Sequence, residues 1–499
     1  MHLRTDLPEF AEDDVLAVPV GAAGALPTWF AAHGPVDAGF LAGALADTGN
    51  GGKPGGITNV PVPGRRPRSL VAVGVGDATL PHLRSATGVA VRRGQTLAEH
   101  GARRLVLPVD SRAGADGVRA VVEAALLAGY RFRHTSTPHP PRLAEVLVVT
   151  ACAGEPQVVA AAQAGRVTAG SVAWARDLVN TPGSTKDPGW VAERVHERLT
   201  AEHVQVTVLG AGDLAAGGFG GVLAVGGASA SPPCVVVARY DPPGAGAGHP
   251  VLVGAGTTFD TGGISIATTA VMRHAHTDVA GAAAVLAAVD AASRLRLPVR
   301  VTAVVPLVEN HVGAGGYRPG DVVRHVGGRT TEVRRTDAEG RLLLADALAW
   351  ARLELGASVL VDVGTLTRAV STALGSRTAG LYAGTDGLAG ALQAAASHTG
   401  ERLWRMPLTE EHVGHLRAQL HSDVADANNA PGDPGATTAA LFLQPFAGDL
   451  PWAHLDVAGP ARAAADDAEV VKGGSGFATR TLLRWLEAGA PTDAEVAVA

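Results

Sequence analysis

Short apolar runs alternate with longer polar or alanine-rich stretches along the first third of the chain. The runs have the length of strands: DVLAVPVG (14–21), SLVAVGVG (69–76), RRLVLPVD (103–110) and EVLVVTACAG (145–154). The segments between them include helix-like stretches such as GVRAVVEAALLAG (117–129). Strand-length runs that alternate with helix-like segments predict an α/β fold.

The remaining two thirds repeat this alternation with stronger strand candidates. These are QVTVLG, CVVVARY, HPVLVGAGTTF, VRVTAVVPLV and ASVLVDVGTLT. Runs that are apolar on both faces favour a sheet covered by helices on each side. A Pro- and Gly-rich cluster, NTPGSTKDPGW, follows a helix-like stretch over 158–179. Because 499 residues exceed one domain of roughly 100–200, we expect two, an N-terminal α/β domain (1–165) and a larger second domain (166–499).

Charge and cysteine content restrict the cellular compartments and the binding partners that can be expected. Lys and Arg number 41 against 47 Asp and Glu, so the net charge of −6 gives no reason to expect nucleic acid or an anionic membrane as partner. Two cysteines form no CxxC pair, and the acidic start MHLRTDLPEFAEDD does not resemble a secretion signal. No apolar run reaches the roughly 20 residues of a membrane span. We expect a soluble, cytoplasmic protein without a membrane partner.

Several familiar catalytic patterns are absent. HERLT (196–200) lacks the second histidine of HExxH, GGSGF (473–477) is not a GxSxG turn, and GVG (74–76) is a lone glycine pair. These differences argue against a zincin, a serine hydrolase and a dinucleotide-binding protein.

Four carboxylates lie where an apolar strand ends or a short loop turns into a helix. They are Asp260 in TTFDTGG, Asp278 in HTDVAG, and Asp337 with Glu339 in TDAEGR. Loops at the carboxyl ends of strands are where open α/β sheets place their sites. Asp278, Asp337 and Glu339 also precede helix candidates, so they could instead be helix caps and first-turn acids. Asp260 has no helix directly after it.

If the four carboxylates converge, their charge of about −4 requires cations, and two divalent ions would neutralise it. Such a centre activates a water molecule between the metals and polarises a substrate carbonyl, which suits peptide hydrolysis. Arg341, two residues after Glu339, could orient a carbonate-like base beside that water. Its alternative role is a structural salt bridge.

At this point the chain resembles the leucyl aminopeptidase (M17) family of metal-dependent exopeptidases. TDAEGRLLLADAL (336–348) is similar to the family signature NTDAEGR followed by apolar residues, except that Arg335 stands at the leading Asn. Further matching motifs are RDLVNTP (176–182), VGAGTTFDTGGISI (253–266), DVAGAAAV (278–285), RPGDVVR (318–324), GTLTRAVSTALG (364–375), LDVAGPA (455–461) and KGGSGFAT (472–479).

The resemblance implies a small N-terminal domain and a larger catalytic domain, for which we expect a central mixed sheet covered by helices. It implies an exopeptidase that removes the N-terminal residue of peptides, and a homohexamer. It also implies metal-ligand roles for Asp260, Asp278, Asp337 and Glu339, and a bicarbonate base held by Arg341.

Two family lysines are absent from this chain. The metal-binding lysine of the family's VGKG stands as Ala255, and the catalytic lysine of GGISIK stands as Ala267. Without the nitrogen donor at 255 the site is all oxygen, which favours Mn²⁺ or Mg²⁺ over Zn²⁺. Without the cation at 267, loss of one oxyanion stabiliser costs on the order of 10²–10³ in rate.

Neighbouring residues could compensate for these losses or alter specificity. His276 lies two residues before Asp278 and would share its face in an extended segment, with His274 two residues further away. The alternative for both histidines is a surface or supporting role. Arg368, where the family has a small residue, could narrow the substrate cleft or could be a solvated surface arginine.

Three hypotheses follow. The first is a metalloaminopeptidase that is specialised, for example for the precursor peptide of one biosynthetic pathway. The second is a pseudo-peptidase that keeps the fold as a scaffold, and the third is a catalytically impaired variant in which both alanines were introduced by design. Nucleic-acid binding is disfavoured by the net charge of −6.

Overall fold

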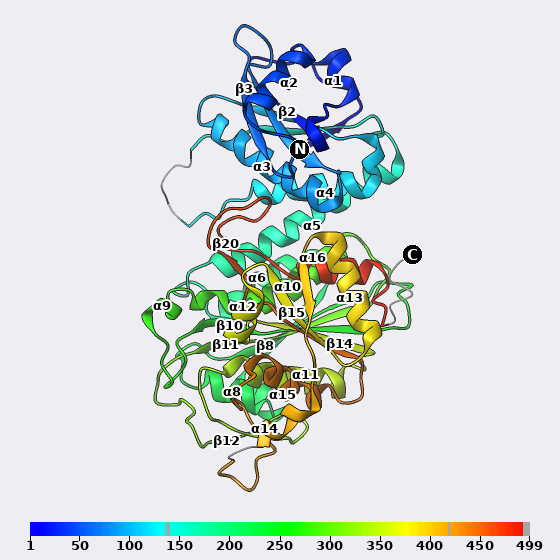
Figure 1. The fold of residues 1–499 in the computed structure, drawn as a ribbon. Helices are drawn as coiled ribbons and strands as arrows, with labels where there is room; N and C mark the ends of the chain where they lie inside the picture. The colour runs from blue at the N-terminus through cyan, green and yellow to red at the C-terminus, as the bar shows by residue number, and fades with distance from the viewer. Residues whose placement is uncertain (135, 137–139, 418–419, 493–499) are drawn as a thin grey trace. The chain divides into compact units, whose positions relative to one another are not determined.

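The structure is a computed structural model, which describes residues 1–492 except 135, 137–139 and 418–419. The chain forms two compact units (Figure 1), the first comprising Met1–Gly170 with Ala464–Lys472, and the second Ser171–Ala463 with Gly473–Ala499. The expected two-domain α/β organisation is therefore confirmed. The boundary between residues 165 and 166 stays a prediction. No helix among the described residues has the length and apolarity needed to cross a bilayer.

The first unit is built on a six-stranded sheet. In spatial order the strands are β1 (His2–Arg4), β6 (Glu145–Val149), β5 (Arg104–Pro108), β2 (Asp14–Gly21), β4 (Ser69–Gly76) and β3 (Ile57–Pro61). Every neighbouring pair is parallel except β3 with β4. The helices are α1 (Thr28–His33), α2 (Ala38–Asp47), α3 (Leu80–Ala98) and α4 (Gly114–Ala128), together with the start of α5 (Pro156–Asn180).

Alternating side chains of the central strands supply two cores, one on each face of this sheet. On β2, Val15 and Ala17 pack with α3 and α4, whereas Leu16 and Val18 pack with α1 and α2. This period of two is the geometry of a strand buried on both faces.

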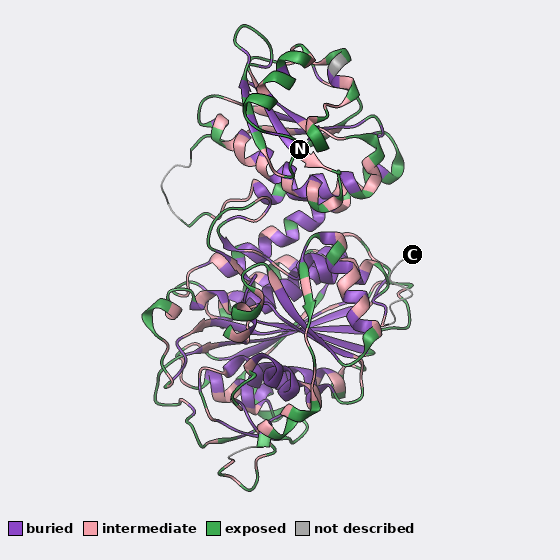
Figure 2. Ribbon diagram, in the orientation of Figure 1, coloured by how far each residue is buried: buried purple, intermediate pink, exposed green. Residues whose placement is uncertain are grey.

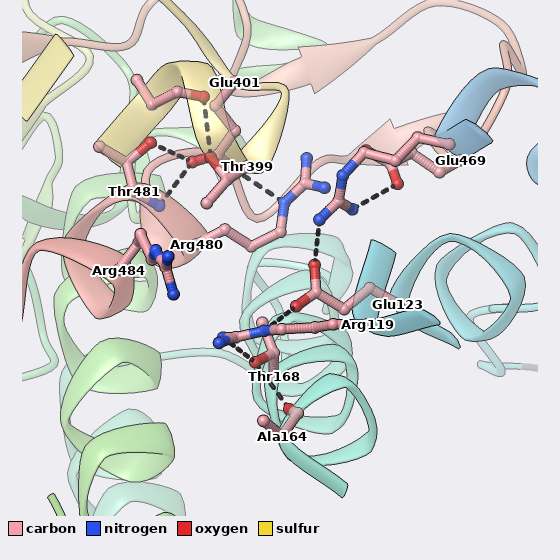
Figure 3. Close-up of polar contacts among 12 residues, drawn as sticks. Arg119, Glu123, Ala164, Thr168, Thr399, Glu401, Glu469, Arg480, Thr481 and Arg484 are labelled. Atoms are coloured by element: carbon pink, nitrogen blue, oxygen red, sulfur yellow. Dashed lines mark hydrogen bonds and ion pairs between the residues drawn. The ribbon is translucent and has the colours of Figure 1, made fainter. Parts of the chain in front are cut away.

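A buried ion network ties the segment Ala464–Lys472 to the helices of the first unit (Figure 3). Arg84 donates to Glu469 at 3.0 Å and to Glu123 at 2.5 Å, and Arg119 donates to the other oxygen of Glu123 at 2.8 Å. All four side chains are largely shielded from solvent. Because buried charges are costly unless paired, this network fixes how the segment crosses α3 and α4.

The second unit is built on a nine-stranded mixed sheet, which confirms the expected mixed sheet. Its spatial order is β16 (Arg402–Arg405), β15 (Thr378–Ala383), β18 (Trp452–Asp456), β14 (Val359–Gly364), β9 (Pro250–Gly254), β11 (Val301–Asn310), β8 (Cys234–Tyr240) and β7 (Gln205–Leu209), with β10 (Gly256–Asp260) paired to β11. The central strands β18, β14, β9, β11 and β10 all run in the same direction. Short strands form two small sheets: β12 (Val322–Arg324), β13 (Thr330–Glu332) and β17 (Ala427–Asn428), and β19 (Arg462–Ala463) with β20 (Gly473–Gly474).

Helices cover both faces of the large sheet (Figures 1 and 2). One face carries α10 (Ala280–Arg294), α13 (Asp386–Thr399) and α16 (Thr479–Glu487), and the other carries α8 (Gly220–Gly226), α11 (Glu339–Glu354) and α15 (Gly435–Ala447). The remaining helices are α6 (Pro188–Thr200), α7 (Ala211–Ala216), α9 (Thr269–Met272), α12 (Arg368–Leu374) and α14 (Val413–Arg417). Side chains of β9, β11, α11 and α15 form one continuous apolar core.

The central parallel strands end at one edge of this sheet. Asp260 ends β10, Asn310 ends β11, Gly364 ends β14 and Asp456 ends β18. Register brings these ends together, because Asp260 pairs with Asn310 and Gly364 pairs with Asp456. This edge is where an open α/β sheet places its site.

Candidate active site

Asp260 is the last residue of β10, and a glycine turn begins directly after it. Its Oδ1 accepts from the amide of Gly262 at 2.8 Å and from Asn310 Nδ2 at 2.7 Å. Gly262 has a φ of +86°, and a Cβ there would lie 2.6 Å from the carbonyl oxygen of Ser265. Glycine is therefore required for the chain to fold back over the carboxylate.

Asp278 lies between the 3₁₀ turn Ala275–Thr277 and helix α10. Its Oδ1 accepts a hydrogen bond at 2.9 Å from the hydroxyl of Thr365, which is the first residue after β14. The cap position of α10 is Val279, which makes no side-chain cap hydrogen bond. Asp278 is therefore not a helix cap, and that alternative is wrong.

Glu339 is the first residue of α11 and is buried. Its Oε1 accepts from the hydroxyl of Thr257 on β10 at 3.2 Å. The cap position of α11 is Ala338, without a side-chain cap hydrogen bond, so Asp337 does not cap this helix either. Glu339 does lie in the first turn, as a first-turn acid would.

Asp260, Asp278 and Glu339, called the carboxylate cluster below, perturb one another's charge. Burial raises the pKa of Asp260 to about 6, and burial followed by the charge of Asp260 raises the pKa of Asp278 to about 8. The pKa of Glu339 is raised well above its ordinary value by burial and then by both aspartates. The hydrogen bonds to Asp260 and Asp278 come from neutral groups, and the charges of Lys186 and Arg368 lower the pKa of Asp278 without cancelling the effect of burial.

Asp337 is held differently from the cluster. Arg335 grips both of its oxygens, with Nε 2.8 Å from Oδ1 and Nη2 2.5 Å from Oδ2. Across the described residues, no three His, Cys, Asp or Glu side chains are gathered closely enough to hold a metal ion together. The carboxylates are thus near enough to raise the pKa values of their neighbours, but they do not form a complete set of metal ligands.

Arg341 lies on α11 two residues after Glu339, and it is buried. Its Nη1 donates to the carbonyl of Asn429 at 2.6 Å, while its buried Nε has no hydrogen-bond partner. Burial lowers the pKa of Arg341 to about 10. Within the described part of the chain it forms no ion pair, so the expected alternative of a structural salt bridge is wrong.

Lys186 is a residue that the sequence reasoning missed. It is fully buried, and its Nζ donates to the carbonyls of Val179 at 3.0 Å and His276 at 2.7 Å. Burial lowers its pKa to about 7, and the charge of Asp278 opposes that shift. The only signal in the sequence is that lysine occurs three times, because Lys186 lies in an irregular segment with no periodic pattern.

The histidines before Asp278 do not take the predicted arrangement. The segment 275–277 is a 3₁₀ turn rather than extended chain, and His276 Nε2 lies 3.4 Å from Arg462 Nη1. Burial, Lys186 and Arg462 lower the pKa of His276 to about 4, so it is neutral at pH 7. His274 is exposed, which fits the supporting or surface role.

The two positions where the family has lysine are occupied here by Ala255 and Ala267. Ala255 is buried between β9 and β10, with its amide donating to the carbonyl of Val363 and its carbonyl accepting from the amide of Ala282. Ala267 is partly exposed, and its amide donates to the carbonyl of Thr261. Exposed Arg368, at the start of α12, lowers the pKa of Asp278 by its charge.

Comparison with known proteins decides the family. The catalytic-domain profile of the cytosol aminopeptidase family matches residues 173–483, and the N-terminal-domain profile of the same family matches residues 36–138. The chain belongs to the cytosol aminopeptidase family. This confirms the resemblance to the leucyl aminopeptidase (M17) family, whose members are metal-dependent hydrolases.

Individual relatives agree with this assignment. A probable cytosol aminopeptidase of Syntrophotalea carbinolica is 42% identical over 418 residues, covering 80% of this chain and 82% of that protein. The solved structure of the bottromycin maturation enzyme BotP in complex with Mn is 37% identical, with a TM-score of 0.83 over 96% of this chain and 100% of that one. A mutant of tomato leucine aminopeptidase is 28% identical, with a TM-score of 0.85 over 97% of this chain and 95% of that one.

Proposed function

We propose that this member of the family removes the N-terminal residue from peptides in a metal-dependent reaction in the cytoplasm. The observation that supports this most is the carboxylate cluster at the carboxyl edge of the central strands, where burial and the charges of neighbouring carboxylates raise all three pKa values. A cluster of partly buried carboxylates requires cations to compensate its charge when its members ionise together.

The donors fit hard divalent ions. Asp260, Asp278, Asp337 and Glu339 are the residues that would hold the divalent ions. The set contains oxygen donors only, because Ala255 supplies no nitrogen, which favours Mn²⁺ over Zn²⁺. The Mn complex of BotP, a relative over its whole length, supports the same choice.

The chemistry that two divalent ions supply at such a site is a lower pKa for a water molecule and polarisation of the peptide carbonyl. Asn310, Thr257 and Thr365 orient the carboxylates through neutral hydrogen bonds and leave their charge for cations. Arg341 has a buried Nε–H without a partner, which fits a small anion such as bicarbonate held beside the cluster as the base.

The two alanines set the expected rate and specificity. With no cation at 267, turnover of general peptides is slower by on the order of 10²–10³ than with a lysine there. We therefore propose a specialised enzyme, for example one that trims a precursor peptide, and BotP, named as a maturation enzyme, supports this idea. A homohexamer is the assembly that the family suggests.

The test is hydrolysis of a panel of peptides by the chain and by its Ala255→Lys/Ala267→Lys variant, each with added Mn²⁺. Release of the first residue by the unmodified chain, at a rate that the variant increases, supports the proposal. Activity in the variant alone would identify the natural chain as a pseudo-peptidase or an impaired form. An N-acetylated copy of each peptide controls for endopeptidase contamination.

A further inference from the structure

Arg335 is a positive charge at the metal site that belongs to this chain and not to the family pattern, where a neutral asparagine precedes the Thr-Asp-Ala-Glu-Gly-Arg motif. Its guanidinium pairs with Asp337 through two parallel hydrogen bonds, at 2.8 and 2.5 Å. This fork is the strongest geometry that an arginine offers a carboxylate. Both oxygens of Asp337 are engaged by it.

The backbone that carries Arg335 is fixed. Asn429 Nδ2 donates to the carbonyl of Arg335 at 2.7 Å, and Asn429 Oδ1 accepts from the amides of Arg334 at 2.7 Å and Arg335 at 3.3 Å. Asn429 also accepts from Arg341 through its own carbonyl, at 2.6 Å. The backbone of Arg335 is therefore held in place, while its side chain remains 64% exposed and can move into solvent.

The other three carboxylates have no such partner. Asp260 and Asp278 accept hydrogen bonds from the neutral groups of Asn310 and Thr365, so their charge remains available to a cation. Among the described residues, the cluster is thus hydrogen-bonded to neutral groups, with Lys186 and Arg368 acting on Asp278 only through their charge. The fourth carboxylate, Asp337, is paired directly with a guanidinium.

We propose that Arg335 competes with a divalent ion for Asp337, so that an ion bound at this carboxylate must displace the guanidinium. The inference rests on the proposed metal-dependent function. Arg335 acts here as a positioning residue, because it controls which partner Asp337 faces.

The experiment is a titration of the metal-stripped full chain with Mn²⁺, followed by the electron paramagnetic resonance signal of free Mn²⁺. The variant Arg335→Asn restores the neutral residue of the family pattern. The matched control is Arg405→Asn, which removes another exposed arginine of the second unit that pairs with an aspartate, Asp386, at 2.5 Å.

For the unmodified chain we expect one tight and one weak Mn²⁺ site. Arg335→Asn should tighten the weak site by about tenfold, from the lost pair and the lost repulsion, with the tight site within about twofold of its original affinity. Arg405→Asn should match the unmodified chain. Adding Asp337→Asn to Arg335→Asn should abolish the gain.

Equal affinity of the second site in the chain and in Arg335→Asn would overturn the inference while leaving the proposed function intact. Absence of any tight Mn²⁺ site in all variants would overturn both. Circular dichroism of each variant checks that the fold is retained.

Discussion

Replacing Asp278 by asparagine should stabilise the metal-free protein, although it removes a group assigned to the site. Asparagine has the same shape, and its Oδ1 can still accept the hydrogen bond from Thr365 that Asp278 accepts at 2.9 Å. What the change removes is a carboxylate that burial and Asp260 make difficult to ionise.

The magnitude follows from the pKa of Asp278, which rises from 3.8 to about 8 on folding. A raised acid pKa contributes stability below pH 3.8 that is lost as the pH rises to about 8. Each pKa unit is worth about 1.4 kcal/mol, so holding this carboxyl in the fold costs about 4 kcal/mol at pH 7, about 5 kcal/mol at pH 8 and about 1 kcal/mol at pH 4.5.

The assay is urea denaturation of the metal-stripped protein at pH 4.5 and pH 8. Asp278→Asn should be more stable than the unmodified chain by up to about 5 kcal/mol at pH 8, with a difference near 1 kcal/mol at pH 4.5. Addition of Mn²⁺ should stabilise the unmodified chain more than the variant, because the ion supplies the missing counter-charge.

The matched control is Asp290→Asn on α10, the helix that follows Asp278 in the chain. Asp290 is fully buried but receives two hydrogen bonds from Arg198, at 3.0 and 2.8 Å, so its loss leaves a cation without its partner and should destabilise the protein by about 3 kcal/mol. A destabilising Asp278→Asn at pH 8, or a gain that does not change with pH, would refute the reasoning about the cluster.

Three further outcomes are expected. The pKa values of Asp260 and Asp278 are raised to about 6 and about 8, so protons compete with the metal for these carboxylates. The Mn²⁺ affinity measured by calorimetry should therefore rise by about tenfold per pH unit from pH 6 to 8, and an affinity that does not change with pH would contradict this. The pKa of Lys186 is lowered to about 7, so the stability that this residue contributes rises above that pH. In denaturation of the metal-stripped protein, the stability lost in Lys186→Met should be about 2–3 kcal/mol larger at pH 9 than at pH 6.5. Equal losses at the two pH values would show that the amine is charged throughout. Arg84→Met weakens the pairing of two buried glutamates and should cost about 3 kcal/mol, seen as faster hydrogen exchange across α3 and α4; unchanged exchange would mean that the network contributes nothing.

The strands of both units were predictable because buried strands have a plain apolar signature. DVLAVPVG and SLVAVGVG correspond to β2 and β4 residue by residue. The run HPVLVGAGTTF was predicted as one strand, but it divides at Ala255 into β9 and β10. The division occurs because β9 pairs with both β14 and β11, while β10 pairs with β11 alone. Pairing partners far along the chain decided this, and a local pattern does not contain them.

The candidate carboxylates were found because each stands at a strand end or helix start, where side chains gather at one edge. The sequence pattern does not predict the direction in which each side chain points. Spacing could not predict that Arg335 holds Asp337, that His276 faces Arg462, or that Lys186 reaches the carbonyl of His276 from 90 positions away. These contacts depend on packing between segments that are remote in sequence.

The most direct measurement of the central claim is the release of the first residue from an unblocked peptide by the metal-stripped chain before and after Mn²⁺ is added. The account predicts release only after Mn²⁺ is added, none from the N-acetylated peptide, and none by Glu339→Gln at any Mn²⁺ concentration. Release that needs no metal, or that persists in Glu339→Gln, would contradict the account, because the buried glutamate of the carboxylate cluster would then take no part in the reaction.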